Sequence, residues 1–150
     1  MGLLDAIQGP RVYLDTNVFI YGIEGFERFE EEIDALFSAV DRGDIEAVTS
    51  ELTRAEALVK PFREEDTALQ QIYQEVLQNR AWFHLVPVVR PLLVESARLR
   101  ASTGLRLPDA IHLASAREME CSTLVTNDDG FKNAPEMHVV ILSEVIPDSE

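Results

Sequence analysis

The sequence has one cysteine, no long apolar run and no positively charged apolar leader. Cys121 has no second thiol with which to form an intramolecular disulfide. No stretch approaches the roughly 18 apolar residues of a membrane-spanning helix, and the first residues lack the pattern of a secretory signal. We therefore expect a reducing, cytoplasmic environment and no association with a membrane.

Positive charge is also scarce. The chain has 13 lysines and arginines against 27 aspartates and glutamates, a formal net charge of −14. Its only lysines are Lys60 and Lys132, and its arginines are scattered. Proteins that bind the sugar-phosphate backbone of nucleic acids usually present a basic face that neutralises the phosphates. This balance argues against an architectural or sequence-reading DNA-binding protein, but not against a metal-dependent hydrolase, whose centre needs carboxylates.

Apolar residues, in contrast, are plentiful. The 150 residues are 46% hydrophobic and 27% charged, which is typical of one globular domain, assigned here to residues 1–150. Apolar spacing predicts strands at 11–15, 46–49, 83–89, 123–126 and 138–142, and helices at 26–43, 50–60, 64–79, 92–102 and 108–120. We expect Pro61 to stop the second helix. Alternating strands and helices imply an α/β fold, with a mainly parallel sheet covered on both faces.

Two acids lie where predicted strands end. Asp15 closes the first strand, and Asp128 follows the strand 123–126 by two residues. In open parallel sheets, ligands bind beyond the carboxyl ends of the strands. We therefore expect Asp15 and Asp128 to lie at the same edge of the sheet.

Two more acids lie on predicted helices. Glu56 shares an i, i+3, i+4, i+7 stripe with Leu52, Ala55 and Val59, so we expect its carboxylate on the core-facing side, where an acid needs a partner or a metal. Asp109 follows Pro108 at a helix start, where the helix dipole favours an anion. Four separate segments thus each supply an acid to one predicted cleft.

Each acid taken singly has an ordinary alternative role. Asp15 and Asp128 are also compatible with turn residues, and Asp109 with a helix-opening acid. Glu56 could instead pair with Arg54 or Lys60. The combination of the four, in this order, favours a shared site.

Four local motifs resemble those of PIN-domain nucleases. An apolar strand followed by Asp-Thr-Asn opens the family pattern, a serine-started helix with a glutamate comes second, an aspartate then opens a helix of small residues, and an acid follows the last motif strand. The matching runs are VYLDTNVFI at 12–20, SELTRAE at 50–56, LPDAIHLASA at 107–116 and LVTNDDGF at 124–131. They occur in family order over nearly the whole chain. Length and strand order are most similar to the VapC-type toxins of toxin–antitoxin pairs.

The resemblance implies a three-layer α/β/α fold and hydrolysis of RNA phosphodiester bonds with Mg²⁺ or Mn²⁺. It implies Asp15, Asp109 and Asp128 as metal ligands, with Glu56 as a further ligand or as the base that positions the attacking water. The groups expected to support these ligands are Thr16, Asn17 and Thr126. An RNA substrate, an antitoxin partner and a homodimer are implied in the same way.

Other polar residues are given ordinary roles. We expect a structural role for His112, one turn after Asp109, and a turn role for Asp129. Candidate phosphate contacts are Arg54, Arg63 and Arg106. A haloacid-dehalogenase-type phosphatase would need a second aspartate at Asn17, and the paired acids of a receiver domain are absent from the sequence. The alternative that stays open is a PIN fold used as a binding module with weak catalysis.

Overall fold

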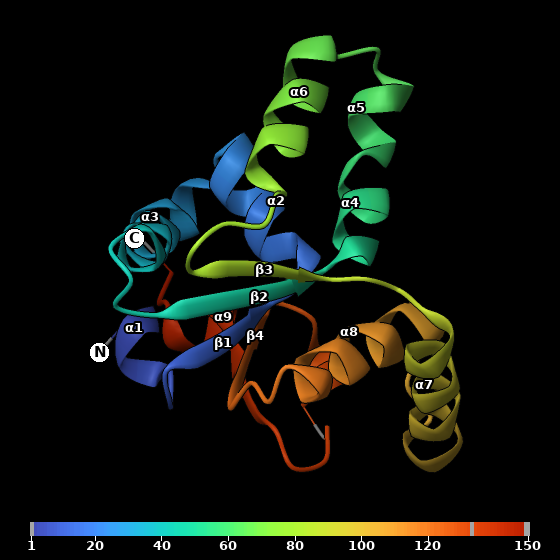
Figure 1. The fold of residues 1–150 in the computed structure, drawn as a ribbon. Helices are drawn as coiled ribbons and strands as arrows, with labels where there is room; N and C mark the ends of the chain where they lie inside the picture. The colour runs from blue at the N-terminus through green and yellow to red at the C-terminus, as the bar shows by residue number, and fades with distance from the viewer. Residues whose placement is uncertain (1, 133, 149–150) are drawn as a thin grey trace.

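The computed structural model describes residues 2–132 and 134–148 and contains a five-stranded parallel sheet (Figure 1). The strands are β1 (Arg11–Leu14), β2 (Glu46–Ser50), β3 (Phe83–Val86), β4 (Thr123–Thr126) and β5 (His138–Ile141), in the order β3-β2-β1-β4-β5. In the register of the central pairs, Tyr13 lies opposite Val48 on one side and Leu124 on the other. The predicted parallel sheet is confirmed, although β3 stops before Pro87, which has no N–H for a ladder.

Side chains alternate between the two faces of this sheet. Val12 and Leu14 belong to one buried cluster, whereas Tyr13 between them belongs to another. The same split separates Leu124 from Val125 on β4. A strand buried on both faces is expected to be apolar throughout, and the fold is therefore the predicted three-layer α/β/α arrangement.

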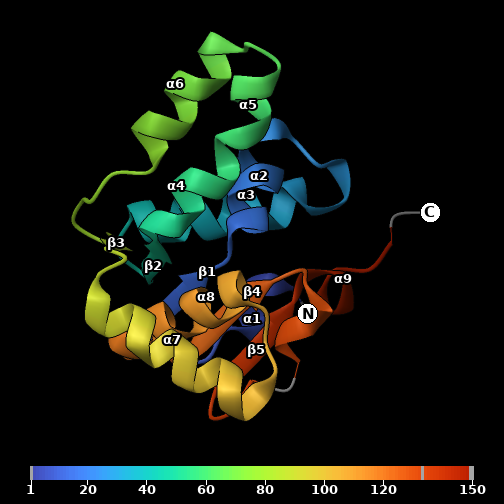
Figure 2. The same ribbon diagram turned by 90° about the vertical axis from the view of Figure 1, so that its right-hand side faces the viewer.

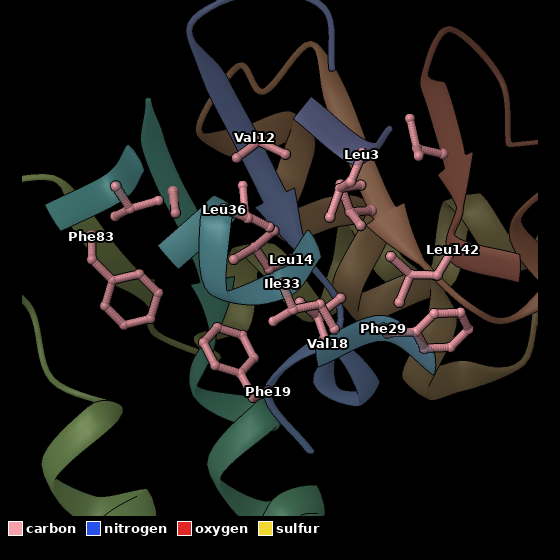
Figure 3. Close-up of a cluster of buried hydrophobic side chains, with 14 of the residues drawn as sticks. Leu3, Val12, Leu14, Val18, Phe19, Phe29, Ile33, Leu36, Phe83 and Leu142 are labelled. Carbon is pink, nitrogen blue, oxygen red and sulfur yellow. The ribbon is translucent and has the colours of Figure 1, made fainter. Parts of the chain in front are cut away.

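The first cluster joins the sheet to helices on one face (Figure 3). Its helices are α1 (Leu3–Ala6), α2 (Thr16–Glu24), α3 (Glu27–Asp41) and α9 (Leu142–Val145). Phe19 of α2 and Ile33 and Leu36 of α3 are at most 1% exposed within it. The sequence patterns predicted α3 but not α2, which begins directly after β1 with Asp15 as its N-cap.

The opposite face is covered by α7 (Arg90–Thr103) and α8 (Leu107–Glu118), which lie below the sheet in Figure 2. All residues of α8 from Asp109 to Ala116 are buried. The small residues Ala110, Ala114 and Ala116 allow this helix to lie close to the strands. Asp109 and His112 are therefore carried by the most enclosed helix of this layer.

A helical hairpin rises from the end of β2, beyond the sheet edge (Figures 1 and 2). It consists of α4 (Glu51–Ala57), α5 (Val59–Arg63) and α6 (Thr67–Val76). The prediction that Pro61 stops the helix was wrong: the break falls at Leu58, and Pro61 lies in the first turn of α5. Proline has no backbone N–H, and none is needed in the first turn of a helix. In a helix continuous from α4, residue 61 would have had to donate to the Ala57 carbonyl.

The predicted helix at 64–79 is also shorter than expected. Glu65 has a positive φ of 53°, which interrupts the helix, and the Asp66 side chain then caps α6 by accepting a hydrogen bond from Leu69 N at 3.0 Å. Over the residues with described positions, no helix combines the length and apolarity needed to cross a bilayer.

The chain reverses its winding direction at β1 and β4. β1 connects onward to β2 through α2 and α3 on one face, whereas β4 is reached from β3 through α7 and α8 on the other. In open α/β sheets such a switch point leaves a crevice beyond the carboxyl ends of the strands. Asp15 and Asp128 follow these two strands, as predicted.

Candidate active site

Asp15 is held in place by a dense set of hydrogen bonds at the end of β1. Its Oδ1 accepts from the backbone N–H of Thr16 at 2.8 Å. Its Oδ2 accepts from Thr126 Oγ1 at 2.6 Å and from Asn17 Nδ2 at 3.2 Å. Asp15 is buried, with only 6% of its surface exposed. Thr126 lies at the end of β4, so these bonds join the two strand ends around one carboxylate.

Asp128 is positioned by the turn that leaves β4. Its backbone N–H donates to Thr126 Oγ1 at 3.0 Å, and its Oδ1 accepts from Gly130 N at 2.8 Å. A Cβ at Gly130 would lie 3.1 Å from Asp128 Oδ1 and 3.5 Å from Asp109 Oδ2. Glycine therefore leaves room beside both carboxylates, a requirement that the sequence patterns did not reveal.

Asp109 is the third residue of α8 and is 7% exposed. Arg106, the N-cap residue of this helix, places its guanidinium 3.3 Å from Asp109 Oδ2 and 3.1 Å from Asp128 Oδ2. Burial raises the pKa of Asp109, and the negative charge of Asp128 raises it further, whereas Arg106 lowers it. The net shift of this pKa is upward, because the cost of burying the charged carboxylate and the repulsion from Asp128 together exceed the effect of Arg106.

Glu56 reaches the site by a different route from the one predicted. Ala55 and Val59 are exposed and Leu52 is half-buried, so the stripe that they share with Glu56 is not the core face of the hairpin; the buried face of α4 carries Thr53 and Ala57. The error arose because a short helix at the sheet edge offers apolar residues to solvent as well as to the core.

The Glu56 side chain, 34% exposed, points across the cleft to α8. Glu56 Oε1 accepts from Thr16 Oγ1 at 2.7 Å and lies 2.7 Å from His112 Nε2. Burial by itself would raise the pKa of Glu56, but the hydrogen bond and charge of His112 lower it below its ordinary value. The alternative in which Glu56 pairs with Arg54 or Lys60 is wrong. Arg54 contacts Glu51 instead, and Lys60 contacts Glu24.

His112 is 1% exposed and has a partner on each ring nitrogen. Nδ1 lies 2.6 Å from the hydroxyl of Tyr13, which is fully buried, and Nε2 faces Glu56 and, at 3.4 Å, Asp15 Oδ1. Burial would lower the pKa of His112, but the hydrogen bond to Glu56 and the neighbouring carboxylates raise it. The expected structural role of His112 fits this burial, but the contact between His112 and Glu56 was not predicted. The i, i+3 spacing of Asp109 and His112 on α8 was a signal that both could face the site.

The four acids line one cleft of about 310 Å³. Its walls are formed by Asp15, Thr16, Asn17, Ile20, Glu56, Arg106, Pro108, Asp109, His112 and Asp128. A neighbouring cavity of about 210 Å³ shares Arg106 and Asp109 and extends to Gly104 and Gly130. A larger groove of about 750 Å³, over β3 and the C-terminal half of α8, contains none of the four acids.

The structure thus gathers the predicted acids from four segments, while their roles as ligands stay a prediction. Within residues 2–132 and 134–148, no three side chains of His, Cys, Asp or Glu form a group arranged to hold a metal ion. Basic side chains stand between the acids instead. Arg106 lies between Asp109 and Asp128, rather than free for a phosphate as expected, and His112 lies between Asp15 and Glu56.

This combination of a parallel α/β/α sandwich and an acidic cleft at its switch point agrees with the sequence comparison. A family model described as the PIN domain matches residues 12–137, and the chain belongs to this family. A search of curated proteins found no match.

Several solved structures have a similar fold. One is a toxin–antitoxin complex from Klebsiella pneumoniae, with 23% identity and a TM-score of 0.65, covering 87% of this chain and 97% of that one. Another is VapBC2 from Rickettsia felis bound to a promoter DNA fragment, with 16% identity, a TM-score of 0.67 and coverages of 87% and 98%. A third is FitAcB from Neisseria gonorrhoeae, with 20% identity, a TM-score of 0.62 and coverages of 85% and 95%. At these identities the likeness establishes the fold.

Proposed function

We propose that this protein is a metal-dependent endoribonuclease that hydrolyses RNA phosphodiester bonds. The observation that carries the proposal is the convergence of Asp15, Glu56, Asp109 and Asp128, from four separate segments, on one cleft at the switch point of the sheet. Acids buried or crowded in this way are costly to a fold unless a cation or another partner compensates them. Membership of the PIN family supports a nuclease as the use of such a cleft.

The donor set suits Mg²⁺ or Mn²⁺, which prefer hard oxygen ligands. Asp15, Asp109 and Asp128 would hold the ion, directly or through water, and Thr16, Asn17 and Thr126 keep the Asp15 carboxylate in a defined orientation. A bound divalent ion would lower the pKa of a water molecule and screen charge on the phosphate. The raised pKa of Asp109 is consistent with this assignment, because burial and the nearby charge of Asp128 disfavour its ionised form, which a cation would stabilise.

Glu56 is suited to orient the attacking water. Its Oε1 is held by Thr16 and His112, and Oε2 has no hydrogen-bond partner in the described part of the chain. Because His112 lowers the pKa of Glu56, the carboxylate is ionised at neutral pH and can accept a proton from water at Oε2. His112 acts on the reaction through Glu56, as a positioning residue.

We further propose that the protein is the toxin of a toxin–antitoxin pair. Support comes from the three solved structures, each matched over 95% or more of its chain; one is a toxin–antitoxin complex, and another is VapBC2, whose name matches the VapC-type resemblance of the sequence. The partner would be an antitoxin protein and the substrate RNA. We also propose that the chain forms one domain over residues 1–150. The protein would be a homodimer and would act in the cytoplasm.

A PIN-fold binding module with little catalysis is the competing proposal. It is favoured by the absence, among the described residues, of a ready group of three metal-binding side chains. Titration with Mn²⁺ separates the two, because a binding module needs no metal in this cleft.

The decisive test is cleavage of a mixed RNA substrate with Mg²⁺, with Mn²⁺ and with EDTA. Asp128→Asn and Asp129→Asn make a matched pair, since both remove one negative charge from adjacent residues. Asp128 lines the cleft, whereas the Asp129 side chain is 78% exposed and lies 3.8 Å from Lys132 Nζ. We expect metal-dependent cleavage that Asp128→Asn abolishes and Asp129→Asn retains; equal activity in the two folded variants would contradict the site.

A further inference from the structure

Arg106 is the one arginine that lines the candidate active site in the described part of the chain. It precedes α8 in an extended conformation, with φ −66° and ψ 156°, and its side chain reaches Asp109 in the first turn of the helix. Its Nε and terminal nitrogen both lie 3.3 Å from Asp109 Oδ2, and the same terminal nitrogen lies 3.1 Å from Asp128 Oδ2. One guanidinium therefore bridges acids that belong to α8 and to the turn after β4.

One of the bridged oxygens, Asp128 Oδ2, is the atom of its carboxylate best placed to bind a cation. Asp128 Oδ1 already accepts from Gly130 N, so Oδ2 is the atom that this residue can offer. On Asp15 both oxygens accept hydrogen bonds from neighbouring residues. A metal that draws Asp109 and Asp128 together would therefore compete with Arg106 at Asp128 Oδ2, and the guanidinium beside Asp109 Oδ2 would oppose its charge.

Arg106 is also weakly held. Its side chain is 73% exposed, although both carboxylates that it contacts are far less exposed, at 9% for Asp109 and 33% for Asp128. Exposed ion pairs contribute little to stability because water and salt screen them. The second cavity, which Arg106 also lines, provides room into which the side chain can withdraw.

We propose that Arg106 is a built-in competitor of the divalent ion. It bridges Asp109 and Asp128 when no metal is bound, limits their mutual repulsion, and leaves these oxygens when the metal enters. This inference rests on the proposed function, because it takes the divalent ion to bind at this cleft. Its consequence is that Arg106 weakens metal binding, the reverse of what a residue that completes a metal site would do.

The test is the Mn²⁺ affinity of the full-length chain, measured by isothermal titration calorimetry at fixed ionic strength. Arg106→Gln removes the bridging charge. Arg98→Gln is the matched control, because the Arg98 side chain is 71% exposed and pairs with Glu95, away from the cleft. We expect Arg106→Gln to tighten Mn²⁺ binding about three- to tenfold, as the loss of weak exposed ion pairs allows, and Arg98→Gln to leave the affinity unchanged.

Thermal unfolding without and with Mn²⁺ provides a second readout. Arg106→Gln should lower the midpoint of the metal-free protein, since the repulsion between Asp109 and Asp128 is then unscreened, and should increase the upward shift that Mn²⁺ produces. Unchanged or weaker Mn²⁺ binding by Arg106→Gln would overturn the inference while leaving the proposed function intact. An equal gain in Mn²⁺ affinity in Arg98→Gln would overturn it too, because the effect would then come from the change in net charge and not from the position of Arg106. Failure of both wild type and Arg106→Gln to bind Mn²⁺ would overturn the proposed metal chemistry as well.

Discussion

Replacement of His112 by phenylalanine tests how the buried polar network supports the site. The substitution keeps a planar ring of similar shape but removes both nitrogens. The hydroxyl of Tyr13, a residue with no exposed surface, then loses the partner that lies 2.6 Å away. A buried polar group left without a partner costs about 1–3 kcal/mol.

Glu56 also loses its contact with Nε2, but its side chain is 34% exposed and water can replace part of that bond. We assign this loss less than about 1 kcal/mol, as for other solvent-screened pairs. The expected destabilisation by His112→Phe is therefore roughly 1–4 kcal/mol in the free energy of unfolding.

The coupling between the two buried residues is the sharper quantity. Tyr13→Phe alone leaves His112 Nδ1 unpaired, whereas the double variant removes both members of the bond. We expect the double variant to be about 1–2 kcal/mol more stable than the sum of the single effects predicts. Urea unfolding followed by far-ultraviolet circular dichroism measures all three, and a coupling below about 0.5 kcal/mol would refute the assigned bond.

The same variant has an expected effect on function. Without His112, Glu56 keeps its contact with Thr16 but loses the partner on α8 that orients it across the cleft. RNA cleavage assayed where His112→Phe is fully folded should fall, and Tyr13→Phe should reduce it less, because Tyr13 does not contact Glu56. Undiminished cleavage by folded His112→Phe would remove the positioning role.

Three further predictions concern separate features of the structure. Asp109→Asn should abolish cleavage while keeping the fold. It should also raise the free energy of unfolding of the metal-free protein at neutral pH, because burial raises the pKa of Asp109 and its ionisation above that pKa opposes folding. Cleavage assays and urea unfolding of the same variant check both effects. Gly130→Ala should weaken Mn²⁺ binding in calorimetry with little change in thermal midpoint, since its methyl group would lie 3.1 Å from Asp128 Oδ1. Glu46→Gln should flatten the pH dependence of stability at acid pH. Arg11 stabilises the ionised Glu46 carboxylate and so lowers its pKa. This contribution to stability is present above the unfolded-state pKa and is lost as the pH falls through the folded-state pKa. Urea titrations between about pH 3 and pH 6 should show the wild type losing more stability than the variant, by up to about 1 kcal/mol.

Much of the fold could be predicted from local patterns. The run from Val12 to Leu14 is apolar at every position because both faces of a central parallel strand are buried, and this property is visible without coordinates. The carboxyl ends of parallel strands share one edge, so Asp15 and Asp128 could be placed together from their positions after two strands. Patterns failed where a local signal has two structural uses, as with Pro61, which suits either the stop of one helix or the first turn of the next.

By itself, the sequence determined the layered parallel fold, the four acids and the sheet edge at which they meet, because these depend on apolar periodicity and on the order of strands and acids along the chain. Tertiary structure alone decided which side chain faces which acid. The bridge from Arg106 to Asp128 spans 22 residues, and that from His112 to Glu56 spans 56. Contacts at such separations depend on how α4, α8 and the turn after β4 pack around the sheet, and no local pattern encodes the angle at which a long side chain crosses a cleft.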